Sequence, residues 1–163
     1  MSKTRTVTIG GRGFWAYDVS VSLLLAETIR VGMELSHDQQ PSWLPEALDK
    51  LRTLVIVTDF GVAIDDDWPS QGVDLLVQLI NEANRRLAAR GSITAAEVAE
   101  WKAVGADQVH LRGAEVVDLS PVVELGQATV QLIHGTLPPP PAGTWWFYGN
   151  EGGPRTIGMR EPT

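Results

Sequence analysis

The chain of 163 residues contains no cysteine, which excludes disulfide bonds, thiolate catalysis and metal sites with cysteine ligands. It also lacks an apolar run of the roughly 20 residues that a membrane-spanning helix requires. Near the start, Val7-Thr8-Ile9-Gly10-Gly11 stands where a signal peptide would have its apolar segment. We therefore expect a cytoplasmic protein that does not associate with membranes.

Lysine and arginine are missing from two long stretches of the chain. The first lies between Arg52 and Arg85 and the second between Arg112 and Arg155. A basic surface that follows a phosphate backbone is therefore not expected, which argues against nucleic-acid binding. The formal net charge of −7 instead favours a basic protein partner, because opposite charge accelerates association.

The length is that of a single domain, residues 1–163, and apolar residues recur at helical spacing in several segments. This spacing predicts helices over about 19–35, 47–55, 73–87, 94–104 and 120–134, although 54–57 also fits a buried strand and 14–21 alternates like a strand. Residues 5–9 read as a strand, and 145–148 with 155–159 read as a terminal hairpin. The predicted fold is α+β, with four or five helices packed against a small antiparallel sheet. The N-terminal strand and the C-terminal hairpin, about 144–160, form that sheet.

A run of prolines, Pro138 to Pro141, precedes the aromatic run Trp145 to Tyr148. The prolines fit a rigid connector better than a polyproline II ligand for a partner's groove. Because side chains alternate along a strand, Trp146 and Tyr148 share one face. Two interpretations stay open for that face: helices cover it, or it is an exposed aromatic patch.

Asp59 and the run Asp65 to Asp67 form the most acidic segment. Clustered carboxylates can serve acid–base catalysis or bind a divalent ion, but the spacing here does not match a calcium loop. The simpler interpretation is a solvated loop at the start of the next helix. We predict no metal and no cofactor, and His110 is the histidine best suited to act as a base.

These features favour a non-catalytic binding protein of the immunity or inhibitor type that engages a basic protein partner. One alternative is a small enzyme that uses the clustered carboxylates and His110, with or without a divalent metal. The other is a subunit that forms a homo-oligomer through its aromatic strand. No catalytic residue is assigned, and the predicted partner-binding residues are Asp59, Asp65, Asp66, Asp67, Trp68, Trp146 and Tyr148.

Overall fold

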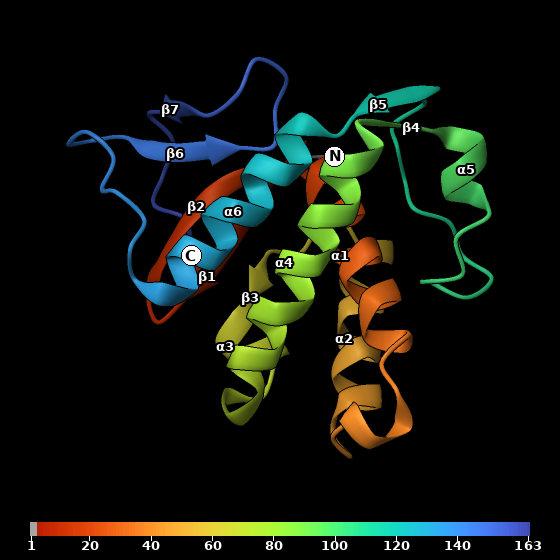
Figure 1. Ribbon diagram of the computed structural model, residues 1–163. Coiled ribbons are helices and arrows are strands. Elements are labelled where there is room, and N and C mark those ends of the chain that lie inside the picture. Colours follow the sequence, from red (N-terminus) through yellow and green to blue (C-terminus); the bar gives the residue numbers. More distant parts are fainter. Residues whose placement is uncertain (1–2) are drawn as a thin grey trace.

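The computed structural model describes residues 3–163 and shows the α+β fold that the sequence predicts (Figure 1). Five strands form a mixed sheet in the order β3-β1-β2-β6-β7. They are β1 (Thr4–Ile9), β2 (Arg12–Tyr17), β3 (Val62–Ala63), β6 (Trp145–Tyr148) and β7 (Arg155–Ile157). The helices are α1 (Asp18–Met33), α2 (Leu44–Ile56), α3 (Ile64–Asp67), α4 (Val73–Arg90), α5 (Ala95–Ala99) and α6 (Ser120–His134), with 3-10 turns at His37–Gln39 and Ser70–Gly72.

The sheet differs from the prediction in how its strands are joined. The C-terminal hairpin forms as predicted, with β6 and β7 antiparallel. It does not pair with β1, however, because β2 lies between them and pairs with β6 in parallel. The alternation in residues 14–21 therefore marks a strand through Tyr17, and Asp18 begins the helix. A second parallel pair joins β1 to the two-residue β3, so the sheet is mixed rather than antiparallel.

Helix α1 is the centre of the molecule, and nearly all of its residues are buried. It packs against α2, α4 and α6, while α6 also lies across one face of β1, β2 and β6 (Figure 1). Helices α4 and α6 approach closely because position 126 is glycine: a Cβ there would lie 2.1 Å from the Oδ1 atom of Asn84. The prediction of a helix rather than a strand at the end of α2 is confirmed.

The ends of the helices follow local sequence signals. Gly91 ends α4 with a φ of 77°, a conformation that glycine adopts without steric cost. Thr94 and Glu97 form the predicted capping box at the start of α5. That helix stops at Ala99 rather than near Val104, and a small second sheet of β4 (Ser92–Thr94) and β5 (Val116–Asp118) packs beside it.

The aromatic strand faces the core on one side. Tyr148 is buried and meets the ring of Phe14 edge to face, with 5.0 Å between ring centroids. Trp146 lies on the same face of β6, half-buried, and packs against the core. Helix α6 covers this face, so of the two interpretations the covered one is correct for Tyr148 and, in large part, for Trp146.

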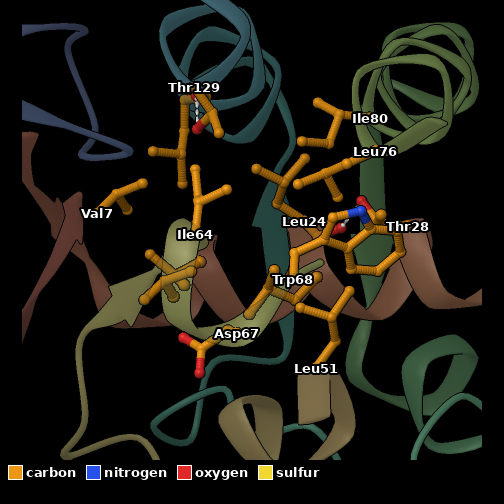
Figure 2. Close-up of a pocket in the computed structure, with 14 residues that line it drawn as sticks. Val7, Leu24, Thr28, Leu51, Ile64, Asp67, Trp68, Leu76, Ile80 and Thr129 are labelled. Atoms are coloured by element: carbon orange, nitrogen blue, oxygen red, sulfur yellow. Dashed lines mark hydrogen bonds between the residues drawn. The ribbon is translucent and has the colours of Figure 1, made fainter. Parts of the chain in front are cut away.

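The core contains a small apolar cavity of about 30 Å³ between α1, α3, α4, α6 and the sheet (Figure 2). The hydroxyl groups of Thr28 and Thr129 line it, but each donates a hydrogen bond to a carbonyl within its own helix. Figure 2 shows the carboxylate of Asp67 at the edge of this apolar cluster. With no free polar group to hold water, the cavity is a packing defect of the core. Within residues 3–163, no helix combines the length and the apolar character that crossing a membrane requires.

Candidate functional site

The loop between α2 and β3, residues 57–61, presents a phenylalanine to solvent while its backbone is held in place. The side chain of Phe60 is 62 % exposed. Its carbonyl oxygen accepts a hydrogen bond of 2.8 Å from the Nε atom of Arg5 in β1. The next residue, Gly61, packs so closely on Thr6 that a Cβ would lie 2.1 Å from the Thr6 hydroxyl oxygen. The loop is therefore tied to the sheet at two consecutive residues, and the aromatic ring projects from a fixed backbone.

Arg5 is a buried cation, only 2 % exposed. Burial lowers the pKa of its guanidinium to about 10, and the negative charges of Asp18, Asp59 and Asp67 oppose that shift. Its two terminal nitrogens have no hydrogen-bond partner in the described part of the chain. The nearby Asp18 is 1 % exposed and is held by a two-pronged ion pair with Arg112, at 2.6 Å for the shortest contact. Within this group of buried charges, Arg5 is the residue that holds the loop, through the Phe60 carbonyl oxygen.

The four aspartates of the acidic segment divide into two that stabilise the backbone and two that are free. Asp65 accepts a hydrogen bond of 3.1 Å from the backbone N–H of Gly10, and Asp67 accepts one of 3.0 Å from Ala63. Burial raises the pKa of Asp67, although the Ala63 hydrogen bond acts in the opposite direction. Asp59 and Asp66 are exposed, and neither makes a side-chain hydrogen bond or salt bridge to any residue from 3 to 163. They are the carboxylates available to a partner.

Phe60, Asp66 and Asp67 line a shallow hollow of about 490 Å³, which we call the Phe60 hollow. Two further exposed apolar residues, Ile56 at 42 % and Val57 at 36 %, stand where α2 ends and the loop that carries Phe60 begins. The full lining is Lys50, Thr53, Leu54, Phe60, Gly61, Ala63, Asp66 and Asp67. This surface thus combines exposed apolar side chains with unpaired carboxylates, a combination that is found at protein–protein interfaces.

Three of the predicted partner-binding residues lie elsewhere. Trp68 is 2 % exposed, donates its indole N–H to the carbonyl oxygen of Gly72 and meets the ring of Trp43 edge to face. Trp146 and Tyr148 face α6 from the sheet. The structure places Trp68 and Tyr148 in the core and Trp146 half-buried against it, so none of the three predicted partner-binding aromatic residues is a fully exposed side chain.

The exposed aromatic residue that the sequence analysis did not single out is Phe60. It stands one position after Asp59, inside the segment already singled out for its carboxylates. The available signal was local: an aromatic residue between Asp59 and Gly61 lies in a turn rather than in a periodic apolar stripe. Exposure of such a side chain is more expected than exposure of a tryptophan next to a helix start.

The carboxylates do not converge on a single point. Among residues 3–163, no group of three or more histidine, aspartate or glutamate side chains lies close enough to hold a metal ion. His110 is exposed and, within residues 3–163, belongs to no such group. Asp59 and Asp67 both oppose the pKa shift of Arg5, which places them near the same buried cation.

Comparison with known proteins gives no further information on this surface. No protein-family model, no curated protein and no solved structure matches the chain.

Proposed function

We propose that this protein is a non-catalytic binding module, of the immunity or inhibitor type, that engages a basic protein partner through the Phe60 hollow. The observation that carries the proposal is the side chain of Phe60, 62 % exposed on a backbone that Arg5 holds, with Asp59 and Asp66 unpaired beside it. A large aromatic side chain held in solvent lies in the position of an interface anchor. The buried Arg5 holds the backbone of that anchor before any partner arrives, which lowers the ordering cost of association.

Charge supports a basic partner over a neutral one. Four aspartates in this region, residues 59 and 65–67, stand against the single cation of the hollow, Lys50. The two free carboxylates are available to pair with lysine or arginine of the partner. Asp65 and Asp67 add to the same negative field while remaining bound to the backbone. Such a field acts mainly on the association rate.

The proposal is tested by affinity capture from the native cell, followed by kinetics with the captured partner. The variants are Phe60→Ala and the double variant Asp59→Asn with Asp66→Asn. Asp107→Asn is the matched control, because Asp107 is another exposed aspartate, in the segment after α5. Phe60→Ala should raise the dissociation rate about tenfold or more, as loss of an anchor does.

The double aspartate variant should slow association and flatten its dependence on salt, whereas the control should leave both rates unchanged. Equal capture by all three variants would contradict the proposal. An association rate that is independent of salt would contradict the role of the carboxylates in particular.

A further inference from the structure

A second hollow, separate from the Phe60 hollow, lies where the proline segment passes the start of the aromatic strand. Its volume is about 280 Å³, and we call it the tryptophan groove. In Figure 1 the chain leaves the end of α6, runs along the outside of the molecule and turns back into β6. The groove is lined by Gly11, Arg12, Gly13, Leu132, Leu137, Pro138, Pro139, Pro140, Trp145, Trp146, Glu161 and Pro162.

One side chain of the tryptophan groove, Trp146, already binds a proline residue of the same chain. The indole N–H of Trp146 donates a hydrogen bond of 2.7 Å to the carbonyl oxygen of Pro138. Aromatic-lined grooves that bind polyproline II peptides combine an aromatic surface with donors to the peptide carbonyls. In this protein the proline segment that contacts Trp146 belongs to the same chain. The backbone N–H and the hydroxyl group of Thr144 donate hydrogen bonds to the carbonyl oxygen of Pro141, and this turn joins the proline segment to β6.

The remaining polar side chains of the groove are two donors, Trp145 and Arg12, and one acceptor, the exposed carboxylate of Glu161. Trp145 is half-buried, and its indole N–H has no hydrogen-bond partner among the described residues. Arg12 is exposed and makes no salt bridge or side-chain hydrogen bond within residues 3–163. Proline lacks a backbone N–H but keeps its carbonyl, so a proline-rich chain offers acceptors to such donors.

We propose that the tryptophan groove binds a proline-rich segment of a partner in the polyproline II conformation. The segment lies alongside Pro138 to Pro140, packs on the two indole rings and accepts hydrogen bonds from Trp145 and Arg12. A polyproline II chain loses little conformational entropy on binding, so a shallow, preformed groove suffices. This inference rests on different residues from the proposed function and stands or fails independently of it.

The test uses two synthetic peptides, a blocked decaproline and a blocked Gly-Ser repeat of the same length. Binding to the full chain is followed by the indole N–H signals in nitrogen–proton correlation spectra, assigned with single Trp→Phe variants. Decaproline should shift the Trp145 signal in a saturable manner, and the Gly-Ser peptide should not. Trp145→Phe keeps an aromatic ring but removes the donor and part of the ring area, and it should weaken binding, followed at the Trp146 signal, about fivefold.

Arg12→Gln should also weaken binding, whereas Trp43→Phe and Phe60→Ala should not, since neither residue lines the groove. The absence of a saturable shift with decaproline at millimolar concentration would overturn the proposal. Equal shifts with the Gly-Ser peptide would overturn it as well. Shifts that depend on protein concentration without peptide would assign the groove to the proline segment of a second copy instead of a partner.

Discussion

The Nε atom of Arg5 lies 2.8 Å from the carbonyl oxygen of Phe60, and this hydrogen bond joins β1 to the loop that carries the exposed ring. A cation buried at 2 % exposure therefore fixes the backbone of a side chain that is 62 % exposed. The guanidinium is held in an unfavourable environment, because desolvation lowers its pKa to about 10. The same residue thus costs stability through desolvation and orders the proposed binding surface.

This relationship predicts that the substitution Arg5→Met makes residues 57–61 less ordered while it changes the stability of the protein little. Removal of a partly unpaired buried charge should change the free energy of unfolding by less than about 1 kcal/mol, because the lost contact is offset by relief of desolvation. Amide hydrogen exchange of residues 57–61 should nevertheless become faster. Exchange measured by mass spectrometry, together with urea unfolding, checks both parts.

The matched comparison is Asp18→Asn, which leaves Arg5 and Arg112 without their buried counter-charge. It should lower the free energy of unfolding by about 3 kcal/mol, the cost of breaking a buried ion pair. Equal and large destabilisation by both variants would show that Arg5 is part of the folding core rather than a support for the loop.

The apolar cavity predicts a stabilising substitution. Val62 lines the cavity, whose volume of about 30 Å³ leaves room for one added methylene group. Val62→Ile should therefore raise the free energy of unfolding by about 0.8 kcal/mol. Val122→Ile is the control: Val122 is fully buried but does not line the cavity, and overpacking there should cost about 1 kcal/mol or more. Thermal unfolding of both variants checks the pair, and the same sign for both would contradict this account of the cavity.

The raised pKa of Asp67 predicts a pH-dependent effect of Asp67→Asn. Burial makes the charged form less favourable in the folded protein, so the folded pKa lies above the unfolded value of about 3.9. The stabilising contribution of this carboxyl is present below the unfolded pKa and is lost as pH rises through the folded pKa. The amide oxygen of asparagine can still accept the N–H of Ala63.

Asp67→Asn should thus unfold at a higher temperature than the wild-type protein at pH 7, and the difference should shrink toward pH 3. Asp107→Asn serves as the exposed control and should show no such trend. A constant difference at every pH would mean that the substitution acts through packing and not through the charge.

The helices and the C-terminal hairpin could be predicted from local signals in the sequence, whereas the order of the strands in the sheet could not. The helix over 73–90 has a clear apolar stripe and is followed by Gly91. Neighbouring residues therefore indicate both that the segment is helical and where the helix ends. The parallel pairing of β2 with β6 sets Trp15 beside Phe147, residues so far apart in the sequence that no local pattern reveals it. The acidic region was recognisable from composition alone. The turn position of Phe60 was a local signal for its exposure, but the hydrogen bond that fixes its backbone was not predictable, because composition would place its donor, Arg5, on the surface.

A network of ion pairs between α1 and α4 predicts how the protein responds to acid. Arg86 of α4 contacts Glu34 at 2.6 Å and Glu82 at 3.1 Å, and it approaches the buried Glu27 at 3.9 Å. The hydrogen bond from Arg86 lowers the pKa of Glu34, and Arg85 and Arg86 together lower that of Glu82 to about 2. Because these folded pKa values lie below the unfolded value of about 4.3, their stabilising contribution is present above that pH. It is lost as pH falls toward about 2.

The substitution Arg86→Met keeps most of the apolar stem and removes the charge. It should lower the free energy of unfolding at pH 7 by about 1 kcal/mol, since the pairs with Glu34 and Glu82 are partly exposed. The free energy of unfolding should also fall less steeply between pH 4 and about pH 2, because the pKa values of Glu34 and Glu82 would lie closer to their unfolded values. Urea unfolding across this pH range measures both effects.

Arg90→Met is the matched control, because Arg90 on the same helix pairs only with Glu97 at 3.2 Å within residues 3–163. If the free energy of unfolding fell equally steeply with pH in Arg86→Met and in the wild-type protein, the network would contribute nothing to stability in acid.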